Sequence, residues 1–111
     1  MTRFLEIRGY VIAPGERAAF HDLFTTECVP LLERWRTDVV AFGPSTHDEI
    51  SYVLMRAYRS LADRQSEQDA FYGSADWRQG PRDRILARIA AMTSVVLELD
   101  DAVIDGLRRS R

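Results

Sequence analysis

The sequence contains no lysine and only one cysteine, and it lacks the signatures of several function classes. All 15 basic residues are arginine, and they are spread among 17 acidic residues, so no basic stripe indicates nucleic-acid binding. Cys28 cannot form an internal disulfide, and no apolar run approaches the length of a membrane span. No signal peptide is recognisable at Met1. We therefore expect a cytoplasmic protein with no membrane or nucleic-acid partner.

Motifs for cofactors are also missing. The sequence has no glycine-rich phosphate loop, no serine elbow and no paired-cysteine motif. His21 and His47 are far apart, and neither has a ligand-type residue three or four positions away. The sequence therefore predicts no cofactor and no metal site. A haem-handling protein with His21 as a single axial ligand stays open as an alternative.

The sequence does contain strands whose two faces differ. Residues 3–12 and 50–58 both alternate between a small apolar set and a second set of larger side chains. Val53, Met55 and Ala57 belong to the first set. The second set is mostly aromatic or charged and consists of Phe4, Glu6, Arg8, Tyr10, Tyr52, Leu54, Arg56 and Tyr58. A strand without a wet face is usually covered on both sides.

The remaining periodicities complete a β-α-β-β-α-β order. A helical pattern runs from Glu16 to Trp35, with a kink expected near residues 28–29 because Pro30 lies inside it. Ser60 is a candidate N-cap for the second helix. Further strands are predicted at 38–47 and 92–99, and short helical segments at 75–77 and 82–89.

This order predicts an α+β, ferredoxin-like fold, in which an antiparallel sheet carries helices on one face. We expect a single domain over residues 1–111, with a core at about 3–99 and a short C-terminal tail at 100–111. The first and third strands should lie side by side at the centre. If the helices cover the small apolar set, the aromatic set would lie in water, which soluble monomers seldom tolerate. A homodimer whose sheets face one another would enclose that set in a barrel-like interior.

Three stretches resemble the NIPSNAP family within the dimeric α+β barrel superfamily. They are Glu6 to Tyr10 followed by Pro14-Gly15, Leu54 to Arg64, and Ala75 to Arg78, and the resemblance extends over about residues 3–99. It implies a ferredoxin-like protomer that dimerises through its sheets. Most members have no assigned reaction, and related barrels include cofactor-independent monooxygenases, isomerases and cyclases of aromatic polyketides, and haem-degrading enzymes.

Side chains of the second set supply the candidate catalytic residues. We expect these to project into one interior: Glu6, Arg8, Tyr10, Arg56, Tyr58 and Glu98. A glutamate would act as the base, the arginines would hold an anion, and the tyrosines would orient or protonate the substrate. The expected substrate-binding wall consists of Phe42, Tyr52, Leu54, Phe71, Tyr72 and Trp77.

A purely structural interpretation stays open beside the catalytic one. Glu6 would pair with Arg56, and Glu98 with Arg8, only to neutralise buried charges, and the aromatic residues would be core. The leading functional prediction is a small-molecule-binding protein that acts, without a cofactor, as an isomerase, cyclase or monooxygenase on a hydrophobic aromatic or polyketide-like compound. The alternative is a non-enzymatic dimeric binding or interaction module.

Overall fold

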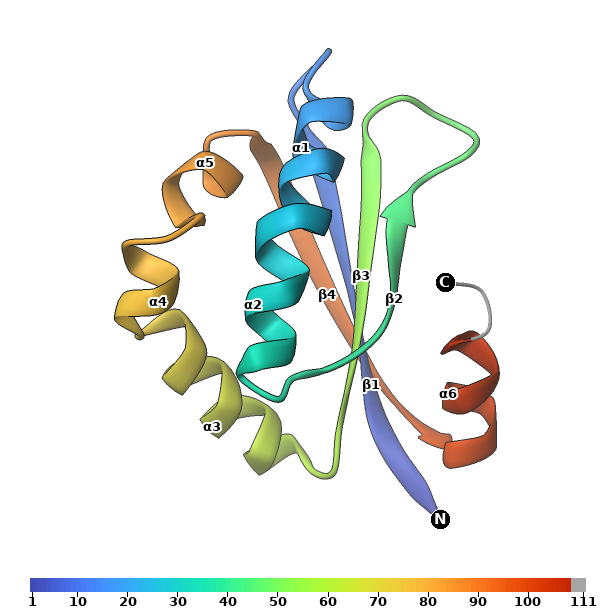
Figure 1. Ribbon diagram of the computed structural model, residues 1–111. Coiled ribbons are helices and arrows are strands. Elements are labelled where there is room, and N and C mark those ends of the chain that lie inside the picture. The colour runs from blue at the N-terminus through green and yellow to red at the C-terminus, as the bar shows by residue number, and fades with distance from the viewer. Residues whose placement is uncertain (109–111) are drawn as a thin grey trace.

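Four strands form one antiparallel sheet in the computed structural model, which describes residues 1–108. The strand order is β2-β3-β1-β4, so the first and third strands lie at the centre, as predicted (Figure 1). The edge position of β2 agrees with its Gly43-Pro44 end, and a register irregularity falls between Val39 and Ala41. The strand bounds are Thr2–Ile12 for β1, Asp38–Pro44 for β2, Ser51–Tyr58 for β3 and Ile89–Asp100 for β4.

Two groups of helices cover one face of this sheet (Figure 1). Between β1 and β2 the chain forms α1 (Arg17–Leu23), a π-helical turn η1 (Phe24–Cys28) and α2 (Val29–Arg34). Pro30 lies in the first turn of α2, and the π-helical turn η1 directly precedes this helix. A π-helical turn changes the hydrogen-bond pattern without ending the helix, so the predicted kink appears as a change of helix type.

The second group follows β3 and comprises α3 (Leu61–Tyr72), α4 (Ala75–Arg78) and α5 (Arg82–Leu86). The predicted cap of α3 is confirmed, because the Ser60 hydroxyl oxygen accepts a hydrogen bond from the Asp63 backbone N–H at 2.9 Å. The βαββαβ order and the antiparallel sheet confirm the predicted ferredoxin-like fold class.

The helices cover the opposite face of the sheet from the one predicted. The aromatic and charged set lies beneath the helices: the rings of Tyr10 and Tyr52 lie 5.8 and 4.9 Å from that of Phe20 on α1. The small apolar set instead faces away from these helices. Val95 and Leu97 of β4 share that face, opposite Ile7 and Leu5, and are 54% and 42% exposed. Alternation defines two faces but not which one the helices cover. Here the aromatic residues on the helices decide, because they pack against the aromatic face of the sheet.

The predicted C-terminal tail contains a helix that packs on the sheet. Helix α6 (Asp101–Arg108) follows β4 and lies on the face opposite to the other helices (Figure 1). Its Ile104 is fully buried against Leu5, Val40 and Ala57. Residues 101–108 are therefore part of the folded unit, and helices lie on both faces rather than on one.

Candidate functional site

A buried ion pair between the two central strands is the foundation of the candidate site. Glu6 on β1 and Arg56 on β3 are cross-strand neighbours, and their side chains are 0% and 1% exposed. Arg56 Nε donates a hydrogen bond to Glu6 Oε1 at 2.9 Å. The pairing that the structural interpretation predicted for these two residues is confirmed.

The second carboxylate oxygen of Glu6 binds side chains from the same strand and from α3. Glu6 Oε2 accepts hydrogen bonds from Gln68 Nε2 at 2.7 Å, from Arg64 Nε at 2.8 Å and from Arg8 Nη2 at 3.5 Å. Three guanidinium groups thus surround one carboxylate. Three positive charges against one negative charge leave a surplus of two within this group, which we call the Glu6 cluster: Glu6, Arg8, Arg56 and Arg64.

The cluster fixes the ionisation of Glu6. Burial alone raises the pKa of the Glu6 carboxyl, but Arg56, the Gln68 hydrogen bond and Arg8 outweigh it and lower the pKa to about 2. An ionised carboxylate whose two oxygens already accept several hydrogen bonds is poorly suited to take a proton from a substrate. The structure does not support the predicted role of Glu6 as a general base.

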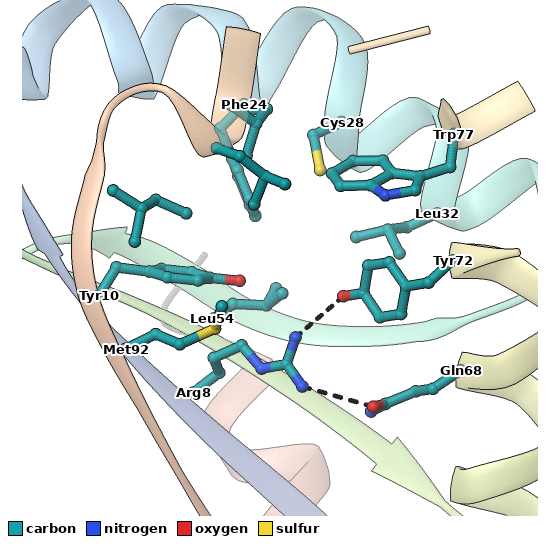
Figure 2. Close-up of a pocket in the computed structure, with 13 residues that line it drawn as sticks. Arg8, Tyr10, Phe24, Cys28, Leu32, Leu54, Gln68, Tyr72, Trp77 and Met92 are labelled. Carbon is teal, nitrogen blue, oxygen red and sulfur yellow. Dashed lines mark hydrogen bonds between the residues drawn. The ribbon is translucent and has the colours of Figure 1, made fainter. Parts of the chain in front are cut away.

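A pocket of about 290 Å³ lies directly beside the cluster, between the sheet and the helices (Figure 2). Most of its wall is apolar, with Phe24, Leu32, Leu54, Trp77, Ile85, Leu86, Ile89 and Met92. Its polar wall consists of Arg8, Tyr10, Cys28, Gln68 and Tyr72. A mainly apolar cavity with a few convergent polar groups is the usual form of a small-molecule site, and this volume is near the lower end of the range.

Arg8 joins the pocket to the cluster. Its guanidinium donates from Nη1 to the Tyr72 hydroxyl oxygen at 3.0 Å and from Nη2 to Gln68 Oε1 at 3.3 Å (Figure 2). Arg56 Nη1 donates to the same Tyr72 oxygen at 2.9 Å. Both guanidinium carbons lie 5.8 Å from the centre of the Tyr72 ring. One phenol is therefore held between two cations at the wall of the pocket.

The other titratable groups of the wall are held in their neutral forms. Burial raises the pKa of the Tyr10 phenol well above its ordinary value, and its hydroxyl points into the pocket (Figure 2). Burial likewise raises the pKa of the Cys28 thiol to about 12. A thiol with such a pKa is a poor nucleophile at neutral pH, in agreement with the buried position of Cys28.

Comparison with protein families identifies the fold independently. The sequence model of the NIPSNAP family matches residues 5–100. The chain belongs to the NIPSNAP family. The predicted resemblance is thereby confirmed, and the matched range includes every predicted site residue. The search of curated proteins gave no match.

Solved structures of NIPSNAP proteins share this fold. A family member from Agrobacterium tumefaciens superimposes with a TM-score of 0.80 at 18% identity, covering 89% of this chain and 87% of its own. A NIPSNAP domain protein from Burkholderia xenovorans gives 0.78 at 18% identity, covering 88% and 95%. A Bordetella bronchiseptica protein, named as a candidate antibiotic biosynthesis monooxygenase, gives 0.67 at 22% identity, covering 91% and 98%. At these identities the likeness establishes the fold alone.

The NIPSNAP fold brings together eight of the twelve predicted site residues and leaves four elsewhere. Arg8, Tyr10, Leu54, Tyr72 and Trp77 line the pocket. Glu6 and Arg56 lie beneath it, and Tyr58 joins them through a hydrogen bond from Gln68 Nε2 at 3.1 Å. The four that do not line the pocket are Phe42, Tyr52, Phe71 and Glu98.

The predicted pair between Glu98 and Arg8 is wrong. Arg8 lies opposite Ser94 in the β1–β4 register, whereas Glu98 lies opposite Phe4 and accepts a hydrogen bond from the Thr2 hydroxyl at 2.6 Å. Glu98 is also exposed, on an edge strand that the helices leave open. It has neither the position nor the enclosure that a base for this pocket requires.

The aromatic residues outside this pocket contact other side chains of the core. Phe42 and Phe71 contact Phe24 and Trp77 with ring centroids 5.8 and 5.4 Å apart. The Tyr52 hydroxyl lies 2.6 Å from His21 Nδ1. That contact occupies one nitrogen of His21, which does not line the pocket beside the Glu6 cluster. Among residues 1–108 no group of three potential metal ligands gathers, and no helix there is long and apolar enough to cross a membrane.

Sequence reasoning missed Gln68, which links the cluster to the pocket. A usable signal was present in α3, where Arg64, Gln68 and Tyr72 follow one another at intervals of four residues. Such spacing places side chains on one helix face. That polar face, not an apolar stripe, contacts the sheet, because its partner there is the buried Glu6 carboxylate.

Proposed function

We propose that this NIPSNAP protein binds a small hydrophobic compound, aromatic or polyketide-like, in the pocket between sheet and helices. The observation that carries this proposal is the position of Arg8 inside a cluster with surplus positive charge. Among residues 1–108 it is the only formally charged side chain on an otherwise mostly apolar wall. The pocket lies within one protomer, so ligand binding would not require the barrel interior between two sheets.

The geometry favours a ligand with an apolar ring system at one end and a negatively charged oxygen at the other. Phe24, Leu32 and Trp77 supply a flat, apolar wall for a ring system. Arg8 supplies a cation at the opposite wall, and its side chain is only 13% exposed. An oxygen atom of the ligand that carries negative charge would interact with Arg8 more strongly here than in water, because the Arg8 side chain is largely shielded from solvent.

A fluorescence titration tests the proposal. Anilinonaphthalene sulfonate combines a ring system with an anion and should bind the folded wild-type protein with saturable enhancement of its fluorescence. Leu86→Trp places a ring at the half-open edge of the pocket and should weaken this binding by about tenfold, because the new ring occupies apolar area that the ligand would bury. Leu61→Trp, at an exposed position away from the pocket, is the matched control. Equal affinities in the two variants would contradict the proposal.

A second candidate is a cofactor-independent enzyme acting on an enolisable compound. The observation that favours it is the placement of the Arg8 cation and the Tyr72 phenol where the oxygen of an enolate could lie. One structural neighbour carries the name of a candidate antibiotic biosynthesis monooxygenase, which suggests chemistry on small organic molecules within this fold. Neither predicted glutamate is placed as a base, so the proton would leave to solvent.

Hydrogen exchange in heavy water measures this activity directly. β-Tetralone loses a proton from the carbon beside its carbonyl to solvent and regains deuterium there, and nuclear magnetic resonance follows the exchange. The wild-type protein should accelerate exchange and Arg8→Gln should not. A rate equal to that of the buffer with the wild-type protein would exclude this reaction and leave the binding proposal standing.

The two remaining alternatives from the sequence receive less support. A pure interaction module has no need of a pocket beside a charged cluster, whereas this chain has one. A haem protein would need an axial ligand that faces its binding cavity, and His21 does not line the pocket beside the Glu6 cluster.

A further inference from the structure

We infer that the polar wall of the pocket is a hydrogen-bond donor site that selects a carboxylate or enolate oxygen, with Tyr72 and Tyr10 as its specificity-determining residues. This inference rests on the proposed ligand pocket and names the chemical class that the pocket prefers. It follows from counting the hydrogens and lone pairs that the surrounding network leaves unused.

Tyr72 can only donate to a ligand. Its hydroxyl oxygen accepts hydrogen bonds from Arg8 Nη1 at 3.0 Å and from Arg56 Nη1 at 2.9 Å. Guanidinium groups have no acceptor, so the direction of both bonds is fixed. Two donors on one phenol oxygen occupy its lone pairs, and the O–H must point elsewhere. The O–H makes no hydrogen bond to residues 1–108, and the hydroxyl lies at the pocket wall (Figure 2).

Tyr10 supplies a second unused donor. Its side chain is buried, the residue being only 6% exposed, and its hydroxyl has no hydrogen-bond partner within the described part of the chain. Figure 2 shows the hydroxyls of Tyr10 and Tyr72 pointing into the same space, with the Arg8 guanidinium beside them. The hydroxyl oxygen is accessible from the pocket, so a ligand that accepts from it would replace solvent there.

Arg8 supplies a third donor at the same place. Its Nε donates to Ser94 Oγ at 3.3 Å, Nη1 to Tyr72, and Nη2 to Gln68 and Glu6. Of the five guanidinium hydrogens, one on Nη1 is left. Arg8 Nη1 and the Tyr72 oxygen are 3.0 Å apart, close enough for the two oxygens of one carboxylate to bind both.

Acceptors at this wall are scarce. The orientation of the Gln68 amide is fixed, because its oxygen must accept from Arg8 and its nitrogen donates to Glu6 and Tyr58. The acceptors left near the three donors are the second lone pair of Gln68 Oε1 and the lone pairs of the Tyr10 hydroxyl oxygen. The positive surplus of the Glu6 cluster acts in the same direction, since it attracts an anion and repels an ammonium group.

Three naphthalene compounds test this inference independently of the proposed function. Isothermal titration calorimetry at neutral pH would compare naphthoate, naphthalene and naphthylmethylammonium, which share the ring system and differ in the polar end. Naphthoate should bind at least about tenfold more tightly than naphthalene, and the ammonium compound more weakly than naphthalene. Binding of naphthalene without preference for naphthoate would overturn the donor inference and leave the proposed function intact. Binding of none of the three would overturn both.

Matched tyrosine variants then assign the donors. Tyr72→Phe should weaken naphthoate binding by about tenfold and leave naphthalene binding unchanged. Tyr58→Phe removes a hydroxyl from the same network but outside the pocket, and it should change neither affinity. Equal losses in these two variants would show a merely structural role for Tyr72.

Tyr10→Phe is the more stringent variant because it breaks no hydrogen bond within residues 1–108. It should fold with unchanged or greater stability and weaken naphthoate binding by about fivefold. Naphthoate affinity equal to wild type in both Tyr10→Phe and Tyr72→Phe would refute the assignment of these phenols as donors.

Discussion

Each face of the sheet carries one carboxylate surrounded by arginines, and the two sites differ in burial and surroundings. The Glu6 cluster lies under the helices, with a fully buried carboxylate and three guanidinium groups beside a pocket. On the opposite face Asp38 binds Arg3 and Arg108, whose side chains, like that of Asp38, are 25% to 31% exposed, and none of the three lines the pocket beside the Glu6 cluster. Both are arginine–carboxylate sites in sequence terms. Burial and the adjoining cavity make the Glu6 cluster a candidate binding site. The Asp38 site, in contrast, links α6 to β2 through ion pairs.

The largest expected difference between the faces is in stability. Glu6→Gln removes the only anion of its cluster and leaves three guanidinium groups close together, one of them fully buried, so it should lower the free energy of unfolding by about 3–5 kcal/mol. Asp38→Asn breaks partly exposed pairs and should cost about 1 kcal/mol or less. Urea unfolding followed by circular dichroism measures both. Equal costs would mean that burial does not separate the two clusters.

The faces should also differ in their response to acid. The pKa of Glu6 is lowered from 4.5 to about 2 in the folded protein, so its contribution to stability is complete above pH 4.5 and is lost as the pH falls towards 2. A shift of this size corresponds to a contribution on the order of 3 kcal/mol. Urea unfolding at a series of pH values should show the loss in wild-type protein.

The Asp38 site is the internal control for that measurement. Burial raises the pKa of Asp38, but hydrogen bonds from Arg108 and Arg3 outweigh it and lower the pKa below its usual value. Asp38→Asn should therefore remove only a small part of the acid dependence, because these side chains are partly exposed. Survival of the full wild-type dependence in Glu6→Gln would show that another carboxyl is responsible.

The same contrast explains how far the sequence could predict this molecule. Periodicity and the Ser60 cap predicted the order of elements, and the alternation in β1 and β3 correctly grouped Glu6, Arg8, Tyr10 and Arg56 on one face. It could not say which face the helices cover, because each face of these strands is compatible with burial. Contacts between distant segments decide this, above all Phe20 on Tyr52 and Gln68 on Glu6.

The sequence predicted most of the residues of the candidate site but not where in the molecule they meet. Arg8, Tyr10, Tyr72 and Trp77 were expected to meet inside a dimer, and they instead meet between the layers of one protomer. Glu98 was grouped with them by alternation alone. The strand order places Glu98 on an edge strand, and the pairing register places it opposite Phe4. The alternation pattern within one strand contains neither piece of information.

The open apolar face leads to a prediction about assembly. Val95 and Leu97 are exposed on the side of the sheet away from the pocket, where a sheet-to-sheet homodimer would bury them. Val95→Asp should shift the protein from dimer to monomer in size-exclusion chromatography with light scattering, because a charge would be placed in the apolar contact. Leu61→Asp, on the helical side, is the control and should leave the dimer unchanged.

Probe binding sharpens that experiment. Since the pocket lies within one protomer, monomeric Val95→Asp should bind anilinonaphthalene sulfonate with an affinity within about twofold of wild type. Loss of binding together with the dimer would show that the partner subunit completes the site. A wild-type protein that is already monomeric would contradict the predicted dimer.

The smallest effect is expected for the thiol in the pocket wall. Burial raises the pKa of Cys28 to about 12, so at pH 8 its thiolate fraction in the folded protein should be about a thousandfold below that of an ordinary thiol near 9. Iodoacetamide should therefore leave the folded protein almost unmodified over hours, as followed by intact-protein mass spectrometry, and modify it readily in urea. Rapid alkylation of the folded protein would place a reactive nucleophile in the pocket and would favour covalent chemistry over the binding of an anion by Arg8 and the two phenols.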